Sequence, residues 1–366
     1  MRRIPELDAV RGLAALAIVV YHIWIPWCGF LATSVDLFFV LSGYLITTII
    51  ILQQDRPGFL RVFYARRALR IWPIYYVALL ALVVANTFLP GPDSIAAWPY
   101  YLTYTQRLPC YWFGSEPSFP EGFRHTWTLA IEEQFYIVWP LLLVRFGRRA
   151  LVPTALAMIA VAVSARSAGF APWILLTRCD GLALGGLLAW LLARENGQVA
   201  ETWVFAAVGL SGVAYLLLAA VLPGLLIATP FLSSALALSH FGPRMLAINL
   251  LYFGLVGCLV RGSGARWLVP LRLRALSALG QMSYGVYLYH YIILYFVILV
   301  GVWSRLGHWW AGLVTLAASL GVSALSWRYV ERPLLALKDR FGYESRPSRP
   351  EEFQPALRES LRYEGS

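Results

Sequence analysis

Long apolar runs follow one another along this chain, each close to the length that a helix needs to cross a lipid bilayer. One crossing takes about 20 apolar residues. Candidate runs begin near residues 9, 34, 70, 126, 150, 174, 203, 244, 278 and 308. A further run, from Pro223 to Phe241, is apolar but interrupted by Pro230. The pattern predicts an all-α polytopic membrane protein, a bundle of about ten transmembrane helices.

The distribution of basic residues predicts the orientation of this bundle. With ten spans, both termini lie in the cytoplasm, and most Lys and Arg side chains fall in cytoplasmic segments, the usual bias of membrane proteins. An eleventh span through the Pro223 to Phe241 run would move the basic residues between Arg261 and Arg274 to the outer side. We therefore interpret that run as an outer loop or a re-entrant piece.

Composition agrees with a membrane location and excludes other classes. The 366 residues are 59% hydrophobic and 13% charged, with a mean hydropathy of +0.65. The net charge of +11 could indicate nucleic acid, but the basic residues lie in short loops beside the bilayer, where orientation and anionic lipid explain them. We expect an integral multi-pass protein of the cytoplasmic membrane, in contact with lipid and not with nucleic acid.

We predict one membrane domain, residues 1–338, followed by a short tail. From residue 339 the sequence is polar and Pro-rich, too short to build a core of its own. The four cysteines have no metal-ligand spacing, so no metal site is predicted. Cys28 and Cys110 fall in predicted outer loops, where a disulfide is one open alternative.

The first apolar run contains two ionisable residues, Arg11 and His22. A helix turns by 100° per residue, so eleven steps end only ~20° beyond three full turns and both side chains share one face. The axial rise between them is about 16 Å, which places His22 roughly halfway through the bilayer if Arg11 lies at the cytoplasmic boundary. Ionisable residues at that depth normally face a bundle interior or a wet cavity, and histidine suits proton transfer near neutral pH.

Two adjacent carboxylates, Glu132 and Glu133, enter another apolar helix. Neighbouring positions point about 100° apart, so the two cannot act as a facing pair. At least one is expected to face inward, where it could orient a histidine or meet an arginine. Structural ion pairing is the alternative.

Further polar residues lie near the outer ends of predicted helices. Asp36 begins one helix, whose Ser42-Gly43 pair favours close packing, and Arg178 and Asp180 begin another. Mutual or cross-helix neutralisation is the simplest explanation of these charges. A further histidine, at position 290 among several tyrosines, is interpreted as a hydrogen-bonded structural residue.

On the cytoplasmic side, Arg66, Arg67 and Arg70 precede the third predicted helix. Their three- and four-residue spacings place the guanidinium groups close together on a helix, and such clusters bind phosphates well. Anchoring by the positive-inside bias is the alternative.

An aromatic-rich segment lies on the predicted outer side, between residues 90 and 124. It includes Trp98, Tyr101, Tyr104 and Trp112. These rings could anchor the loop at the membrane interface or stack on the faces of a sugar.

Several of these stretches together resemble the acyltransferase-3 family of bacterial membrane O-acyltransferases. The motifs, in order, are "LDAVRGLAALAIVVYH", "SVDLFFVLSGYL", "RRALRIWP", "HTWTLAIEEQFYIVWP", "RCDGLALGG", "MSYGVYLYH" and "SWRYVERP". The resemblance covers about residues 4 to 338. It implies transfer of an acyl group, commonly acetyl, from cytoplasmic acyl-CoA to a hydroxyl of a carbohydrate or glycoside acceptor, without a permanently bound cofactor. Some members carry a fused hydrolase-like domain after the last helix, whereas here we expect a short polar tail at that place.

The resemblance also implies roles for single residues. His22 and Arg11 match the family's Arg and His pair, Glu132 matches its glutamate, and the arginines at 66, 67 and 70 match its basic motif. We expect Arg66, Arg67 and Arg70 to bind the donor and Arg11 to guide it. His22 acts as general base or becomes acylated itself, and the sequence leaves both routes open.

Asp36, Glu133, Arg178 and Asp180 are secondary candidates for the site. A multispan transporter or flippase of a sugar-containing substrate is the alternative function. A sensor or scaffold switched by the protonation of His22 is a third.

Overall fold

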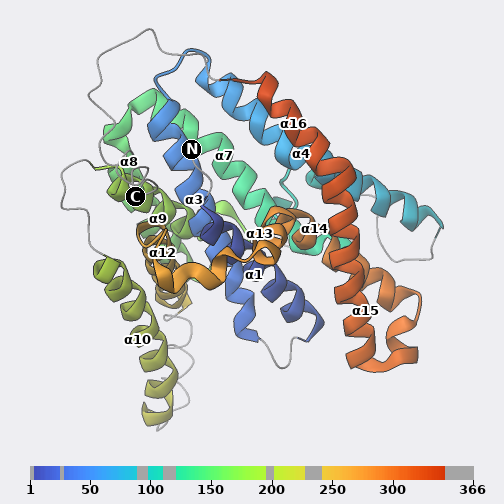
Figure 1. Ribbon diagram of the computed structural model, residues 1–366. Coiled ribbons are helices and arrows are strands. Elements are labelled where there is room, and N and C mark those ends of the chain that lie inside the picture. The colour runs from blue at the N-terminus through green and yellow to red at the C-terminus, as the bar shows by residue number, and fades with distance from the viewer. Residues whose placement is uncertain are drawn as a thin grey trace.

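The computed structural model describes residues 4–24, 29–88, 98–109, 121–194, 202–226 and 241–342. Within these ranges the chain is helical and forms no strand, so the predicted all-α fold is confirmed (Figure 1). The long helices are α1 (Pro5–Ile23), α3 (Ser34–Gln53), α4 (Phe59–Phe88), α7 (Trp127–Phe146), α8 (Leu151–Ser167), α9 (Leu175–Leu192), α10 (Thr202–Leu226), α12 (Phe241–Arg261), α14 (Ser283–Leu299) and α15 (Val302–Ser326).

Short helical pieces connect the long helices. They are η1 (Gly29–Thr33), α5 (Trp98–Leu102), η3 (Glu121–Thr126), η4 (Arg148–Ala150), η5 (Arg266–Arg272), α13 (Arg274–Gln281), η6 (Trp327–Glu331), α16 (Arg332–Ala336) and η7 (Leu337–Arg340). The segment η6 is a turn of π-helix that continues α15 into α16. The last pieces, α16 and η7, return to pack on α4, as the red and blue ribbons in Figure 1 show.

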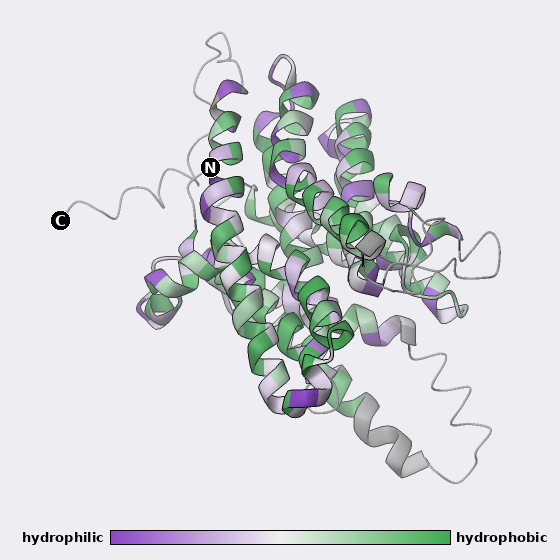
Figure 2. Cartoon of the chain, turned by 90° about the vertical axis from the view of Figure 1, so that its right-hand side faces the viewer, coloured by the Kyte–Doolittle hydropathy of each residue, from purple (hydrophilic) through white to green (hydrophobic). Residues whose placement is uncertain are grey.

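A helix lies at each of the predicted apolar runs, but not every helix is apolar enough to span a membrane by itself. Six of those in the described ranges are long and apolar enough: Phe30–Gln53, Phe59–Ala85, Arg148–Ser167, Leu175–Leu192, Gly242–Arg261 and Val302–Ala336. A seventh is obtained if α13 and α14, bent by 66° at their junction, count as one span. Figure 2 shows that apolar residues are frequent along most of the helices. Several membrane-spanning helices are therefore confirmed, whereas the number ten and the orientation of the termini stay predictions.

Two of the helices that do not meet this criterion contain buried or cavity-lining charged residues. Helix α1 contains Glu6 and Arg11, and α7 contains Glu132 and Glu133. Of the Pro223 to Phe241 run, α10 includes the part up to Leu226, and residues 227–240 lie outside the described ranges.

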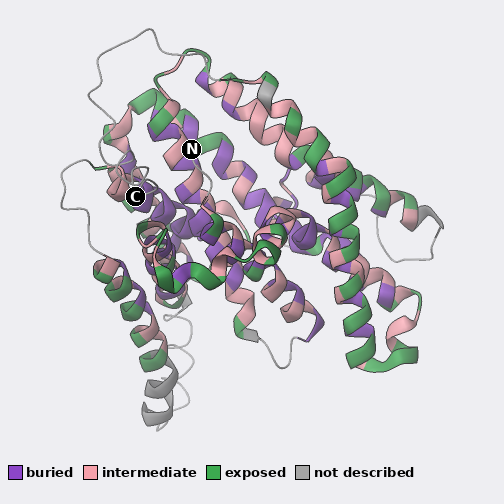
Figure 3. Ribbon diagram, viewed as in Figure 1, coloured by how far each residue is buried: buried purple, intermediate pink, exposed green. Residues whose placement is uncertain are grey.

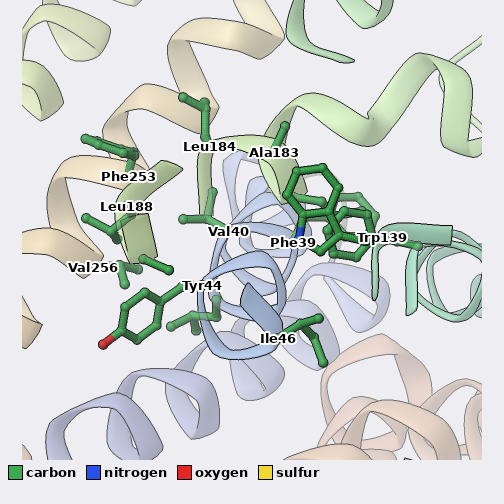
Figure 4. Close-up of a cluster of buried hydrophobic side chains, with 14 of the residues drawn as sticks. Phe39, Val40, Tyr44, Ile46, Trp139, Ala183, Leu184, Leu188, Phe253 and Val256 are labelled. Carbon is green, nitrogen blue, oxygen red and sulfur yellow. The ribbon is translucent and has the colours of Figure 1, made fainter. Parts of the chain in front are cut away.

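Helices α3 and α9 pack backbone to backbone at the centre of the protein. A Cβ atom added to Gly43 would lie 1.9 Å from the carbonyl oxygen of Leu182, and one added to Gly185 would lie 2.1 Å from that of Val40. Only glycine permits this approach, so the close packing predicted for Ser42-Gly43 is confirmed at Gly43. Phe39, Val40, Leu184 and Trp139 belong to the apolar cluster formed around this contact (Figure 4).

Helix α1 is held against α13 and α14. A Cβ atom added to Gly280 would lie 2.0 Å from the carbonyl oxygen of Asp8, and one added to Gly12 would lie 2.7 Å from the backbone nitrogen of Gly280 in α13. At the start of α1, Arg272 forms an ion pair of 2.7 Å with the buried Glu6. These contacts place one face of α1 in the buried interior seen in Figure 3, and they position the site described next.

Candidate active site

A cavity of about 220 Å³ lies between α1, α3, α4, α7 and α14. Its charged lining residues come from three helices: Arg11 from α1, Arg67 and Arg70 from α4, and Glu132 from α7. Its other walls are mainly apolar and aromatic, among them Phe38, Phe39, Leu45, Ile49 and Tyr284. The cavity thus combines a cluster of guanidinium groups with an apolar lumen.

Glu132 is held in the cavity by a short chain of hydrogen bonds. Ser42 donates from its hydroxyl to Oε1 of Glu132, and the Tyr136 hydroxyl donates to Ser42 Oγ at 3.0 Å. The guanidinium of Arg67 lies over the Tyr136 ring, 5.2 Å from its centre. Ser42 therefore binds a candidate catalytic carboxylate, a role that the sequence interpretation of Ser42-Gly43 as simple packing missed.

Glu133 points away from the cavity. It is buried, and its Oε2 accepts a hydrogen bond of 3.0 Å from the Trp72 indole. The predicted divergence of the two adjacent carboxylates is confirmed, because Glu132 lines the cavity and Glu133 does not.

The three clustered arginines divide into two groups. Arg67 and Arg70 line the cavity. Arg66 instead donates to the backbone carbonyls of Phe341 at 2.6 Å and Lys338 at 3.4 Å. Arg66 therefore ties α4 to the end of the described chain, next to the cavity lining.

His22 faces α14 and forms a direct contact with His290. Its Nδ1 lies 3.0 Å from the carbonyl oxygen of Ile18 and 3.0 Å from Nε2 of His290. The Nδ1 of His290 lies 3.1 Å from the carbonyl oxygen of Val286. The sequence predicted an inward-facing His22 on the same side of α1 as Arg11, and both positions face the bundle.

A third imidazole, His125 of η3, joins this pair. Its ring centre lies 5.0 Å from that of His290 and stacks on Tyr291 at 5.2 Å. His125 is buried, yet neither ring nitrogen has a hydrogen-bond partner within the part of the chain that the structure describes. Sequence reasoning missed His125, which directly precedes the predicted span that contains Glu132 and Glu133.

Tyr287 of α14 lies at the boundary between the cavity and the histidines. It lines the cavity, and its ring centre is 5.3 Å from His125 and 5.7 Å from His290. Its hydroxyl donates to the backbone carbonyl of His125 at 2.8 Å and hydrogen-bonds to Thr128. The cavity lining includes Tyr287 and not His22, so this ring separates the arginine-lined space from the imidazoles.

The charges predicted near the outer helix ends form cross-helix ion pairs away from the cavity. Asp36 and Arg178 are 3.1 Å apart, and both are 4% exposed. Asp180 binds both terminal nitrogens of Arg166, at 3.0 and 2.7 Å, in an interior that is almost fully buried. The predicted neutralisation is confirmed in its cross-helix form.

The aromatic residues of the predicted outer segment form part of the core. Tyr101 and Tyr104 are buried, and Tyr104 stacks on Tyr75 with ring centres 4.4 Å apart. Trp98 is half-buried at the start of α5. The buried rings of Tyr101 and Tyr104 are not open to a sugar in this structure. Trp112, Cys28 and Cys110 lie outside the described residues.

The fold and the site together define a multi-pass membrane protein with a buried cavity rich in arginine, next to a group of histidines. The sequence pattern of the family described as "Acyltransferase domain" matches residues 4–328. The chain belongs to this family, the acyltransferase-3 family, as its motifs predicted.

Curated relatives carry acetyltransferase names. The peptidoglycan O-acetyltransferase OatA of Listeria monocytogenes is 28% identical over 354 residues, which are 90% of this chain and 56% of the relative. A protein of Staphylococcus aureus named "Putative O-acetyltransferase" is 27% identical over 91% of this chain and 57% of its own length. A Bacillus subtilis protein named "Putative peptidoglycan O-acetyltransferase YrhL" is 34% identical over 39% of this chain and 24% of its own length.

The chain therefore spans a little more than half the length of the first two of these relatives. No solved structure matches it.

Proposed function

We propose that this protein transfers an acyl group, acetyl in the first instance, from acyl-CoA to a hydroxyl group of a carbohydrate acceptor. The observation that carries the proposal is the cavity, where three guanidinium groups surround an apolar space bounded by Tyr287, whose ring lies beside His290, the partner of His22. Relatives named as peptidoglycan O-acetyltransferases support a cell-wall carbohydrate as the acceptor.

The donor end of the site fits a phosphorylated thioester. Arg11, Arg67 and Arg70 would bind the phosphates, since guanidinium groups form strong charge-assisted hydrogen bonds to phosphate oxygens. The apolar walls suit the uncharged arm that carries the acyl group. We assign the mouth of this cavity to the cytoplasmic side, where acyl-CoA is made.

The acyl transfer itself needs a base, and His22 is placed to act as one. Its Nε2 would take the proton of the acceptor hydroxyl while that oxygen attacks the thioester carbonyl carbon. The carbon–sulfur bond then breaks, and the leaving thiolate takes the proton back from the imidazolium. The products are the O-acyl sugar and free coenzyme A, with no net change in protonation of the enzyme.

Glu132 contributes charge balance at the donor end of the site. Three arginines line the cavity with one carboxylate, and Glu132 keeps its orientation through Ser42. The proposal also requires a movement of the Tyr287 ring, because this ring lies between the cavity and the histidines.

Thioester consumption by the purified protein tests this function. The full chain in detergent or nanodiscs is supplied with acetyl-CoA and a muropeptide or chitooligosaccharide, and free thiol and acetylated sugar are measured. We expect His22→Ala to lower the rate by at least 100-fold, the lower end of general-base catalysis. His308→Ala, which removes another half-buried histidine away from the cavity, is the matched control.

Two outcomes would contradict the proposal. One is a wild-type protein that consumes no thioester with any sugar acceptor but moves a glycoside across a vesicle membrane, which would favour a transporter. The other is a His22→Ala variant as active as the His308→Ala control.

A further inference from the structure

The contacts around His22 fix which of its ring nitrogens holds the proton. The Nδ1 of His22 faces two groups, the carbonyl oxygen of Ile18 and the Nε2 of His290, each at 3.0 Å. A carbonyl oxygen only accepts hydrogen bonds. Nδ1 of His22 must therefore carry the hydrogen if the contact with Ile18 is a hydrogen bond.

The same reasoning applies to His290. Its Nδ1 faces the carbonyl oxygen of Val286 at 3.1 Å, so Nδ1 carries the hydrogen there as well. A neutral imidazole has one N–H group, which leaves Nε2 of His290 with a lone pair. That lone pair accepts from Nδ1–H of His22 in a three-centre hydrogen bond shared with the carbonyl oxygen of Ile18.

The opposite assignment is much less favourable. If Nε2 of His290 donated to Nδ1 of His22, the lone pair of His22 Nδ1 would face the carbonyl of Ile18. The bare Nδ1 of His290 would likewise face the carbonyl of Val286. Two buried contacts at hydrogen-bond distance would then be repulsive, and His290 is fully buried. Protonating both nitrogens of His290 would place a charge in the interior without a counter-ion.

We propose that His290 is a positioning residue that holds His22 in the tautomer with hydrogen on Nδ1 and a free lone pair on Nε2. This inference rests on the proposed function of His22 as the base. In the described part of the chain, Nε2 of His22 makes no hydrogen bond, so it is the nitrogen that can take the acceptor's proton. His290 then performs the task that a carboxylate performs for the histidine of a serine hydrolase triad.

His290 also stabilises the imidazolium form of His22 that exists during the reaction. When Nε2 of His22 takes a proton, Nδ1–H remains and its hydrogen bond to His290 becomes charge-assisted, and hence stronger. No proton passes to His290 in this scheme. A neutral acceptor suits a base that must give its proton to the leaving thiolate within the same turnover.

The tautomer can be measured directly on the unaltered protein. The chain has five histidines, so ¹⁵N-histidine labelling and solid-state NMR in lipid give a spectrum of few signals. The signals of His22 and His290 are assigned by their loss in the His22→Ala and His290→Gln variants. We expect a protonated Nδ1 and a bare Nε2 at both residues. A His22 with hydrogen on Nε2, the form that predominates in free histidine, would overturn the proposal.

Kinetics of three variants test the consequence. His290→Gln can place an amide oxygen near the position of Nε2, His290→Asn places its amide near the position of Nδ1, and His290→Leu has no acceptor. We expect the His290→Leu and His290→Asn variants to have a kcat lower by about 10- to 100-fold, which is the effect of losing one hydrogen bond to a charged group. The KM for acetyl-CoA should stay unchanged in these variants. The His290→Gln variant should keep a large part of the wild-type kcat.

The failure of this inference is distinguishable from failure of the proposed function. Equal kcat in the Gln and Leu variants, both eluting as intact folded protein, would overturn the role of His290 while the wild type remains an active transferase. If the wild type consumes no thioester, the proposed function fails, and the NMR result still decides the tautomer. A raised KM with unchanged kcat in His290→Leu would assign the residue to donor binding and overturn its positioning role.

Discussion

Two groups of buried charges in this protein differ in how they are balanced. Near one end of α3, α8 and α9, each arginine has its own carboxylate: Arg178 pairs with Asp36, and Arg166 with Asp180. In the cavity three arginines share the lining with Glu132. No ion pair within 4 Å joins a carboxylate to these three arginines in the described ranges.

This difference in charge balance distinguishes arginines that stabilise the fold from arginines that are available to bind a ligand. A buried pair that is fully hydrogen-bonded neutralises itself and needs no further partner. A cavity with more guanidinium groups than carboxylates is stable only because water or an anion can enter it. Balance of buried charge is therefore a better guide to function here than burial, because the paired residues are the more deeply buried ones.

The largest effect is expected on stability, at the paired group. Asp180→Asn leaves the guanidinium of Arg166 buried without a counter-charge, which should cost about 3–5 kcal/mol of folding free energy. We expect little folded protein in the membrane and a clearly lower melting temperature in detergent. The double variant Arg166→Met, Asp180→Leu removes both charges and should recover most of the stability. A wild-type melting temperature for Asp180→Asn would contradict a structural role for this pair.

The cavity arginines should show the opposite pattern. Arg70→Ala is expected to raise KM for acetyl-CoA by about 10-fold or more, the value of one hydrogen bond to a charged group, with an unchanged melting temperature. The same holds for Arg67→Ala. Arg61→Ala is the control, because Arg61 lies on the same helix but is exposed and outside the cavity lining. A KM equal to that of Arg61→Ala would remove Arg70 from the donor site.

The positions of the apolar helices and of the inward-facing polar residues could be predicted from the sequence, because both follow from helix periodicity and from the high cost of a polar group in lipid. The face shared by Arg11 and His22, the divergence of Glu132 from Glu133, and the neutralised charges near Asp180 are of this kind. Each of these predictions needed only the geometry of one helix or the sign of a charge.

What the sequence could not predict depends on contacts between distant segments. The pairing of His22 with His290 joins positions 268 residues apart, and no spacing within either helix indicates it. The same applies to Ser42 and Glu132, 90 residues apart. Arg66 has the same spacing signal as Arg67 and Arg70, yet the returning segment at Lys338 and Phe341 binds it. Tyr101 and Tyr104 have the composition of an interface loop but are buried against Tyr75.

A smaller effect, on pH dependence, is expected at Lys338, which follows the last span and lies beside the arginine cluster. Burial, and then the positive charges of Arg70, Arg67 and Arg66, lower the pKa of the Lys338 ammonium to about 7. Lys338 is therefore mostly charged at pH 6 and mostly neutral at pH 8. If it adds to the positive field that attracts the donor, binding of coenzyme A should weaken by two- to fivefold across this interval, an effect of about 0.5–1 kcal/mol.

Equilibrium binding of coenzyme A, rather than turnover, isolates this effect from the protonation of His22. The phosphates of coenzyme A also titrate near neutral pH, so the comparison is made with Lys338→Arg, which keeps its charge throughout and shares the same ligand. We expect the ratio of Kd at pH 8 to Kd at pH 6 to be two- to fivefold larger in the wild type than in Lys338→Arg. Equal ratios in the two proteins would show that the charge at position 338 does not reach the donor, and the binding site would then be limited to the arginines that line the cavity.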